Sequence, residues 1–375
     1  MRIVQVAPLV SPIDETREPI GGAQVLLAEL ARGLAARGHE VTLAAADGSR
    51  LSGMRVAPLA IHSAALRPAP MAQTSGERGD EAQQAEAFGR VRGWIEDHRA
   101  EIDVVHAHAY DAPAFDALAG APRPVVHTLH LPPLDDAVVR AARRASDATM
   151  VTVSDANARA WRSQSVPVPY VVHNGIDLDR IPLGVARGTH LVCAGRISPE
   201  KGVHVAIAVA RRVGRPLVIL GGVYDASYFA TAVAPRVREL PNWRPGDPVS
   251  GAVYIGRRSR SELHGIVASS AVTLMPVLWD EPFGLVALES LAAGTPVVAY
   301  RRGGLAEILD ATSGELVAPG DETGLERAIG RAAMWPPDAC RARAARFSLG
   351  AMLSGYEAVY AAVQSGAPRR DAGYP

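Results

Sequence analysis

Residues 190–220 read HLVCAGRISPEKGVHVAIAVARRVGRPLVIL and show how this chain folds. Two runs of apolar residues, 190–193 and 217–220, have the length of buried strands, and a helical pattern lies between them. A strand, a crossover helix and a second strand form the βαβ unit of a parallel sheet. Arg196 and Lys201 stand in the loop after the first strand, so two cations leave the tip of one strand together.

The same alternation of apolar runs and helical patterns continues along the chain and falls into two series. The runs of the first series are residues 3–6, 41–44, 103–106, 125–128, 150–153 and 170–172, and those of the second are 190–193, 217–220, 253–255, 272–275, 296–299 and 315–317. Residues 177–188 carry Pro182, Gly184 and Gly188 without a long periodic pattern, so we expect the linker between two domains there. The predicted fold class is α/β, with two Rossmann-like parallel sheets that bind ligands beyond the carboxyl ends of their strands.

Size and charge narrow the class of protein. With 375 residues the chain exceeds the length at which one hydrophobic core stops growing, which favours two domains. Thirty-nine basic residues balance 39 acidic residues, so no overall field attracts nucleic acid or an anionic membrane. Nowhere do about eighteen apolar residues run together, so we expect a cytoplasmic protein without a membrane span. Cys193 and Cys340 lack the spacing of a zinc site and are not expected to form a disulfide.

Residues 279–289 read WDEPFGLVALE, a turn with one carboxylate that leads into a helix with another. Pro282 fixes φ at the mouth of the helix, and the amides of the first turn have no partner inside it. These amides and the positive end of the helix dipole attract oxyanions and hydroxyl oxygens. An ionised glutamate accepts hydrogen bonds from two adjacent hydroxyls, as on a hexose or a ribose. Glu281 and Glu289 therefore predict a site that holds a sugar ring and a ribose together.

This stretch closely resembles the Glu-Pro-Phe-Gly…Glu signature of retaining glycosyltransferases of family 4, and it keeps the family's spacing of the two acids. The resemblance implies that Glu281 contacts the hydroxyls of the donor sugar and that Glu289 contacts the ribose of the nucleotide. Further implied donor-site residues are Phe283 and Gly284 on the sugar side, and Leu285 and Val286 on the nucleotide side.

The loop at residues 195–202 is similar to the Gly-Arg…Glu-Lys-Gly motif of the same family. A departing nucleoside diphosphate develops negative charge, which preplaced cations stabilise without a metal ion. The resemblance implies Arg196 and Lys201 as the diphosphate contacts. It also implies a phosphate contact at Gly22, in the Gly-Gly pair before the first helix. Family members commonly have Glu where this chain has Gln24, and this difference puts the acceptor contacts in doubt.

A second glycine pair, Gly303-Gly304, resembles the Gly-Gly-x-x-Glu that follows the signature helix in this family. It is expected to shape the wall of the donor pocket. Glu307, the acid of this motif, is expected to brace its own helix.

Histidines stand at the ends of several predicted strands. The Thr-x-His of residues 128–130 resembles the family segment whose histidine lies beside the anomeric carbon. The catalytic set implied by the resemblance is therefore His130, Glu281, Arg196 and Lys201. His106 and His108 are expected on the acceptor side. The spacing of the strand-end histidines suggests a metal site. Such histidines without a third ligand are more often structural, and no metal is expected. Asp177-Leu178-Asp179 looks like the metal-binding Asp-x-Asp of another glycosyltransferase class, yet it falls in the linker and is expected to be a turn.

The family resemblance implies a GT-B architecture, in which two Rossmann-like domains face each other across a cleft. An acceptor-side domain is expected at residues 1–180 plus 348–375, where the last helix returns to it, and a donor-binding domain at 186–347. Residues 62–84 are expected to be either an acceptor lid or a variable loop, and the tail from 366 onward is expected to be disordered.

The implied activity is transfer of a hexose-type sugar from a nucleoside-diphosphate sugar to an acceptor hydroxyl, with retention of configuration and without a metal or other cofactor. The base, the sugar, the acceptor and the oligomeric state, including a possible homodimer, stay open. Two other interpretations are a nucleotide-sugar epimerase or phosphorylase-like enzyme on the same fold, and a catalytically silent binding subunit. The sequence shows no general base for an epimerase, and an inactive relative need not keep all four charged donor-site residues.

Overall fold

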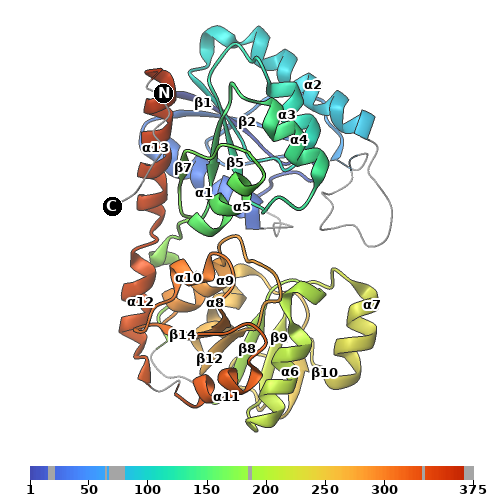
Figure 1. Cartoon of the computed structure of the whole chain (residues 1–375), viewed down its shortest axis with the longest axis vertical. Helices are drawn as coiled ribbons and strands as arrows, with labels where there is room; N and C mark the ends of the chain where they lie inside the picture. The colour runs from blue at the N-terminus through green and yellow to red at the C-terminus, as the bar shows by residue number, and fades with distance from the viewer. Residues whose placement is uncertain (16–21, 64–65, 67–80, 185–187, 332–333, 367–375) are drawn as a thin grey trace. The chain divides into compact units, whose positions relative to one another are not determined.

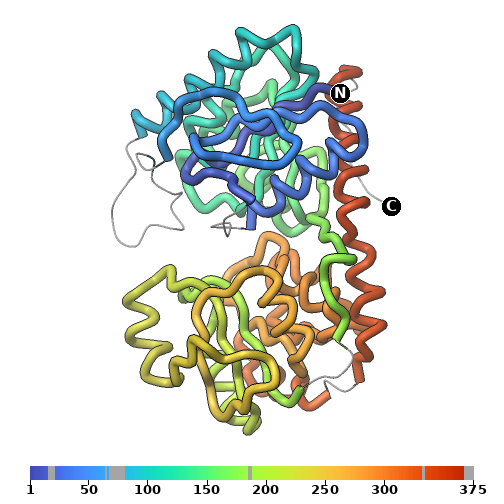
Figure 2. The backbone as a smooth tube through the Cα atoms, turned by 180° about the vertical axis from the view of Figure 1, so that it is seen from behind, coloured from blue at the N-terminus to red at the C-terminus, as the bar shows by residue number. Residues whose placement is uncertain are grey.

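The computed structural model describes residues 1–15, 22–63, 66, 81–184, 188–331 and 334–366. They form two compact units, each with its own parallel sheet (Figure 1). Unit 1 comprises Met1–Gly175 and the chain from Leu349 onward, and unit 2 comprises Ile176–Ser348. The colours of Figure 2 follow the chain from the blue and green of unit 1 through unit 2 to the red C-terminal helix, which belongs to unit 1 again.

Unit 1 is built on a seven-stranded sheet in the order β3-β2-β1-β4-β5-β6-β7, and all its described strand pairs are parallel. Its strands are β1 (Arg2–Val6), β2 (Glu40–Ala44), β3 (Arg55–Val56), β4 (Val104–Ala107), β5 (Val125–Leu129), β6 (Thr149–Thr152) and β7 (Tyr170–Val171). Its helices are α1 (Gly22–Ala36), α2 (Glu81–Asp97), η3 (Arg99–Glu101), α3 (Ala112–Leu118), α4 (Asp136–Arg144), α5 (Asp155–Ser163) and α13 (Leu349–Gln364). Strands β4, β5 and β6 are buried at every residue, as expected for a parallel sheet between layers of helices.

Unit 2 has a second seven-stranded parallel sheet, in the order β10-β11-β9-β8-β12-β13-β14. Its strands are β8 (Leu191–Ala194), β9 (Leu217–Leu220), β10 (Arg238–Glu239), β11 (Ala252–Tyr254), β12 (Val272–Met275), β13 (Val297–Tyr300) and β14 (Gly314–Val317). Its main helices are α6 (Val203–Arg212), α7 (Ala226–Tyr228), α8 (Arg260–Ala268), α9 (Leu285–Ala292), α10 (Leu305–Ile308), α11 (Glu322–Gly330) and α12 (Pro337–Ala345). Short helical turns are η4 (Leu178–Arg180), η5 (Pro199–Lys201), η6 (Phe229–Val233) and η7 (Ala234–Arg236).

All strands predicted from apolar runs are present, with their ends within one residue of the prediction. The fold class, two Rossmann-like parallel sheets, is confirmed. Two outer strands, β3 and β10, are not predicted. Each has only two residues, and Arg55, Arg238 and Glu239 give no apolar signal.

In both sheets the first strand of the series lies near the middle, and the later strands are added on either side of it. In unit 1, β2 and β3 lie on one side of β1, and the strands from β4 onward lie on the other side. In unit 2, β9 to β11 lie on one side of β8, and the strands from β12 onward lie on the other side. Where the strand order reverses in this way, the loops diverge at the carboxyl ends of the strands, where open parallel sheets bind ligands. The candidate site residues of each unit follow these strands and their neighbour β5.

The segment predicted as a linker belongs to unit 2 where the structure describes it. Gly184 N donates to Ala293 O at 2.9 Å, and Gly188 N donates to Ser269 O at 2.8 Å. Arg341 on α12 donates to Ile181 O at 2.9 Å. These bonds fix residues that Pro182 and the glycines mark as irregular, and the structure places the unit boundary at Gly175 instead.

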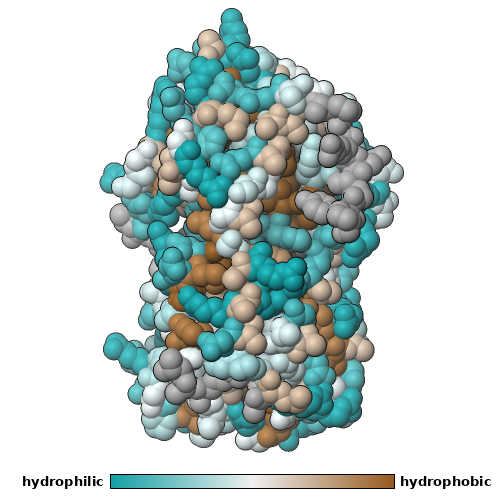
Figure 3. All heavy atoms as spheres, turned by 90° about the vertical axis from the view of Figure 1, so that its left-hand side faces the viewer, coloured by the Kyte–Doolittle hydropathy of each residue, from teal (hydrophilic) through white to brown (hydrophobic). Residues whose placement is uncertain are grey.

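The buried face of α13 carries Leu353, Tyr356, Val359 and Tyr360. This helix packs beside α1 within unit 1. No helix in the described part of the chain is long and apolar enough to cross a membrane. On the face drawn in Figure 3, hydrophobic side chains lie in small groups among hydrophilic ones.

Candidate functional site

An ion pair between Lys201 and Glu281 lies at the carboxyl end of the unit 2 sheet. Lys201 Nζ donates to Glu281 Oε2 at 2.6 Å, and Trp279 Nε1 donates to the same oxygen at 2.8 Å. The ammonium nitrogen also lies 4.9 Å from the centroid of the Trp279 ring, within the range of a cation–π contact. The Lys201 and Glu281 side chains are only 17% and 12% exposed, so water screens the pair incompletely. The structure thus brings together two of the predicted site residues.

The two segments that carry this pair meet because β8 and β12 are neighbours in the sheet. Leu278 N donates to Glu200 O at 2.8 Å. Gly202 has a φ of +67°, and a Cβ at this position would lie 2.0 Å from Pro276 O, so only glycine allows this close approach. The turn η5, which ends at Lys201, is therefore held against the segment that leads to Glu281.

Arg196 is the second cation of the loop after β8. Its guanidinium carbon lies 5.1 Å from the centroid of the Tyr224 ring, and Nη2 lies 3.5 Å from Glu200 Oε1. Ser198 Oγ donates to the same Glu200 oxygen at 2.6 Å. The Arg196 side chain is 27% exposed. It is oriented by its neighbours but keeps part of the guanidinium open to solvent.

Helix α9 begins without a side-chain cap. Its N-cap residue is Gly284, with a φ of +109° in the left-handed region, where glycine carries no steric cost. The preceding Phe283 is buried, whereas Leu285 and Val286 are half-buried. The first-turn amides of α9 therefore keep hydrogen-bonding capacity for a ligand.

Glu289, one turn further along α9, is held in a buried ion pair. Arg260 donates to Glu289 Oε1 through Nε at 3.0 Å and through Nη2 at 2.6 Å, and His264 Nε2 lies 3.3 Å from the same oxygen. The Glu289 side chain is 6% exposed. Burial opposes ionisation, but the hydrogen bond from His264 and the charge of Arg260 outweigh it and lower the pKa of Glu289. The carboxylate is thus kept in the form that accepts hydrogen bonds from hydroxyls.

Three residues of this site were not assigned from the sequence. Arg260 and His264 lie four residues apart on α8, so the i, i+4 spacing of two side chains that can donate hydrogen bonds, after a predicted strand, was a usable signal. Trp279 lies in the quoted signature stretch, but nothing in the sequence shows that its indole N–H points at Glu281.

The Gly303-Gly304 pair supports the turn that carries Glu281. A Cβ on Gly303 would lie 2.2 Å from Glu281 O, and a Cβ on Gly304 would lie 2.7 Å from Pro282 O. Gly304 N donates to Glu281 O at 2.7 Å. The pair therefore touches the backbone of the signature turn, which gives a physical reason for two glycines at this position.

Gly303→Ala is expected to lower the free energy of unfolding by about 3 kcal/mol, because the new methyl group meets backbone atoms at a left-handed φ of +56°. Urea unfolding measures this change. Gly320→Ala is the matched control, since Gly320 has a φ of +84° but no atom within 4 Å of its added Cβ. The free energy of unfolding of this control should fall only by the cost of placing alanine at a left-handed φ, about 1 kcal/mol. Equal losses in the two variants would contradict the close contact with Glu281.

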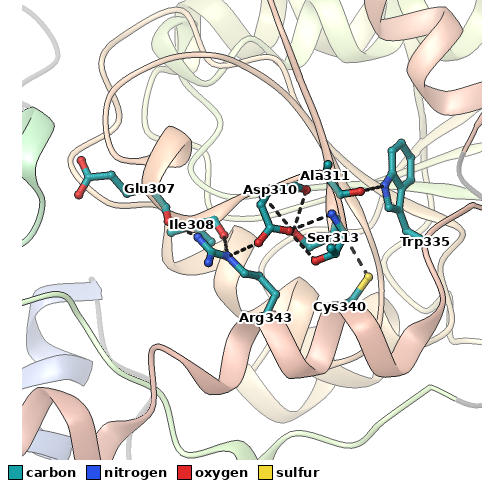
Figure 4. A network of polar contacts seen from close by, with 9 residues as sticks. Glu307, Ile308, Asp310, Ala311, Ser313, Trp335, Cys340 and Arg343 are labelled. Carbon is teal, nitrogen blue, oxygen red and sulfur yellow. Dashed lines mark hydrogen bonds and ion pairs between the residues drawn. The ribbon is translucent and has the colours of Figure 1, made fainter.

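Helix α10, which follows the glycine pair, is tied to α12 by a polar network (Figure 4). Arg343 donates to Ile308 O and to Glu307 O, each at 2.6 Å, and Arg343 Nε lies 3.2 Å from Asp310 Oδ2. The guanidinium thus satisfies carbonyls at the C-terminal end of the short helix. In Figure 4 the Glu307 carboxylate points away from these residues, so its main-chain carbonyl, not its side chain, joins this network.

In unit 1, the predicted histidines lie side by side at the carboxyl ends of β4 and β5: His106 within β4, His108 directly after it and His130 directly after β5. His130 is half-buried, and its Nε2 lies 3.0 Å from His108 Nδ1. Burial lowers the pKa of His130 to about 4, so the ring is neutral at pH 7. His106 and His108 are 0% and 2% exposed and are hydrogen-bonded to other side chains. Their expected place on the acceptor side stays a prediction, and at this burial their rings contact other side chains of unit 1.

Gly22 is the exposed first residue of α1, directly after residues 16–21, which lie outside the described part of the chain. Gln24, two residues later, is buried and donates to Ser11 O at 3.4 Å and to Ser11 Oγ. Where the family commonly has Glu, this chain thus uses an amide that holds the loop after β1 by donating hydrogen bonds.

Two further predictions concern the linker and the variable segments. Asp177 accepts from Asp179 N at 3.2 Å and caps η4, so Asp177-Leu178-Asp179 forms a turn as predicted. Most of the 62–84 segment and the tail from 367 onward lie outside the described residues.

Comparison with known proteins agrees with this arrangement. The family model Glycosyltransferase Family 4 matches residues 20–180, and the model Glycosyl transferases group 1 matches residues 188–334. Glycogen synthase of Mycobacterium tuberculosis is 36% identical over 188 residues, which are 47% of this chain and 42% of the relative. D-inositol 3-phosphate glycosyltransferase of Mycobacterium avium is 31% identical over 281 residues, which are 68% of this chain and 63% of the relative. The chain thus spans less than two thirds of the length of these curated relatives.

A solved structure of the Anabaena protein HepE in complex with UDP-glucose matches 96% of this chain and 100% of that chain, with a TM-score of 0.70 and 18% sequence identity. At this identity the match shows a common fold, the GT-B fold of two Rossmann-like domains. The two family models, the signature residues around Glu281 and the GT-B fold lead to one conclusion: this chain belongs to glycosyltransferase family 4.

Proposed function

We propose that this protein is a retaining glycosyltransferase that moves a hexose-type sugar from a nucleoside-diphosphate sugar to an acceptor hydroxyl. The observation that carries the proposal is the contact of Lys201 and Trp279 with Glu281 beside the uncapped start of α9. A cation, a carboxylate and open amides suit a diphosphate and a sugar ring. Relatives named as enzymes of glycosyl transfer, and a structural neighbour with UDP-glucose bound, support this reading.

Lys201 and Arg196 stabilise the leaving group in the proposed reaction. When the bond between the anomeric carbon and the phosphate oxygen breaks, the electron pair and its negative charge go to the diphosphate. Lys201 Nζ has three donors, of which one is used by Glu281, so two remain for phosphate oxygens. The partly exposed guanidinium of Arg196 supplies a second fixed cation. Because these charges are already in place, the proposal needs no metal ion.

Glu281 orients the donor sugar. Both of its bonds to Lys201 and Trp279 use Oε2, and Oε1 makes no hydrogen bond to any residue that the structure describes. Oε1 therefore accepts from a sugar hydroxyl in the proposal. The backbone contacts of Gly303 and Gly304 fix this turn, so most of the entropy cost of positioning Glu281 is met when the protein folds and not when the donor binds. The acceptor hydroxyl then attacks from the face of the leaving phosphate, which takes up its proton.

Glu289 is the proposed contact of the nucleotide ribose, since Arg260 and His264 keep it ionised and fixed. The test is a calorimetric cycle in buffer with EDTA. UDP, GDP, ADP and dTDP are compared first, and the diphosphate that binds best is then compared with its form lacking the ribose hydroxyls. Removing these hydroxyls is expected to weaken binding to the natural protein about tenfold, and to change binding to Glu289→Gln far less.

Glu326→Gln is the matched control, because Glu326 pairs with Arg212 on the surface of the same unit. It should bind each ligand as the natural protein does. Absence of binding to all four diphosphates would count against the proposed function, and an equal ribose effect in Glu289→Gln would count against the role of this carboxylate. Transfer that continues in EDTA supports the metal-free mechanism, and retention is read from the anomeric configuration of the product.

A further inference from the structure

A continuous chain of hydrogen bonds runs through the core of unit 1 from His130 to the C-terminal helix α13. His130 Nε2 lies 3.0 Å from His108 Nδ1, and His108 Nε2 lies 2.6 Å from Gln5 Oε1. Gln5 Nε2 donates to the Tyr360 hydroxyl at 3.3 Å. Gln5, His108 and Tyr360 are all at most 2% exposed. The partly exposed imidazole of His130 is therefore connected through two buried side chains to a tyrosine near the end of the chain.

The chain of bonds continues beyond Tyr360. Its hydroxyl lies 2.7 Å from His106 Nδ1, and His106 Nε2 lies 2.7 Å from Thr128 Oγ1. Thr128 Oγ1 lies 3.1 Å from the Tyr356 hydroxyl. None of these side chains is more than 3% exposed. In such a series every group that accepts from one neighbour donates to the next, so the bonds share one direction.

The Gln5 amide sets that direction. An amide oxygen only accepts, so His108 Nε2 carries a proton and donates to Gln5 Oε1. A neutral imidazole has one N–H, so His108 Nδ1 is unprotonated and accepts from His130 Nε2–H. The second nitrogen of His130, Nδ1, then has a free lone pair. It makes no hydrogen bond within the described parts of the chain, and the ring is only half-buried.

We propose that Gln5 and Tyr360 are positioning residues, which hold His130 in the tautomer with its proton on Nε2 and present Nδ1 as a hydrogen-bond acceptor for a substrate hydroxyl. We assign this hydroxyl to a sugar, and this part of the proposal rests on the proposed function. The assignment of the tautomer rests only on the contacts in unit 1. His106 and His108, expected from the sequence on the acceptor side, act through other side chains in this proposal.

The tautomer is measured directly by nitrogen NMR of the full chain labelled with ¹⁵N-histidine, with His130→Gln to identify the resonances of His130. The natural protein is expected to show His130 Nε2 as the protonated nitrogen and Nδ1 as the unprotonated one. Tyr360→Phe removes the hydroxyl that accepts from Gln5 and leaves the amide free to turn over. The expected result is a loss of the single tautomer, seen as averaged shifts for both His130 nitrogens.

Tyr356→Phe is the matched control. It removes the same hydroxyl from the same buried face of α13, but this hydroxyl lies at the far end of the chain of bonds, beyond Thr128. The His130 tautomer should stay as in the natural protein. If Tyr360→Phe does not fold, Gln5→Met, which keeps the length of the side chain and removes the amide, takes its place.

Kinetics then link the tautomer to transfer. Tyr360→Phe or Gln5→Met is expected to lower kcat/KM for the donor sugar about tenfold, the cost of one unsatisfied hydrogen bond, whereas Tyr356→Phe should change it less than about twofold. A proton on His130 Nδ1 in the natural protein, or an unchanged tautomer in both Tyr360→Phe and Gln5→Met, would overturn the proposal. Failure of the proposed function would appear differently, as no transfer by the natural protein although the tautomer is as assigned.

Discussion

Lys201→Met is expected to lower kcat/KM for glycosyl transfer about a thousandfold. The substitution keeps much of the length of the side chain but removes the ammonium group that lies 2.6 Å from Glu281 and is proposed to face the diphosphate. Removing one preplaced group from a transition-state site costs up to about 4 kcal/mol in other enzymes, which corresponds to this factor. Initial rates with the preferred donor sugar, at several donor concentrations, give the value.

Arg212→Met is the matched control for Lys201→Met. Arg212 pairs with Glu322 on the surface of unit 2, and its side chain is 41% exposed, so losing this pair costs little stability and no activity. Unfolding curves for both variants separate a catalytic effect from a folding effect. Transfer by Lys201→Met at the natural rate would remove Lys201 from the mechanism.

Acid is expected to unfold unit 1 well above the pH at which exposed carboxylates protonate. Burial lowers the pKa of His127 to about 3 and that of His130 to about 4, and it lowers the pKa of His106 and His108 well below the ordinary value. The folded state then binds fewer protons than the unfolded state below about pH 6.5, so stability falls as the pH drops. Each neutral histidine contributes a slope that approaches about 1.4 kcal/mol per pH unit about one unit below pH 6.5, or about 5.5 kcal/mol per unit for the four together.

Urea unfolding at pH 7.5, 6.5 and 5.5 measures this slope, and His127→Leu tests its origin. Both ring nitrogens of His127 are buried and have no hydrogen-bond partner among the described residues, and the ring stacks on Phe115 at 4.4 Å between centroids. The leucine variant should be more stable at pH 7.5 by about 1–2 kcal/mol and should lose stability less steeply on acidification. His62→Gln, at a side chain that is 82% exposed, should leave the slope unchanged. Stability that stays constant down to pH 5.5 would show that these histidines do not remain neutral in the folded state.

The parallel sheets could be predicted from the sequence because their buried strands are short runs of apolar residues. Strands β9 and β12 have the predicted bounds, since every residue in them faces the core. The two-residue strands β3 and β10 could not be predicted in this way, because pairing with a neighbouring strand, and not burial, defines them.

The candidate site was predictable to the extent that its residues lie within short motifs. Lys201, Glu281 and Glu289 stand in such motifs, but the partners of Glu289 come from α8, and only the packing of α8 beside α9 brings Arg260 to it. The burial of His106 likewise depends on Tyr360, which is 254 residues away in the chain. Contacts over such separations are set by tertiary packing and leave no local pattern in the sequence.

The two short outer strands also have a consequence for how copies of this protein can associate. An outer strand with free N–H and C=O groups can template a further strand from another molecule, which is a route to aggregation. Here β3 and β10 offer only two residues each, and the exposed charges of Arg55, Arg238 and Glu239 must be desolvated before a foreign strand can add. These margins of the two sheets are thus poor templates for fibril growth.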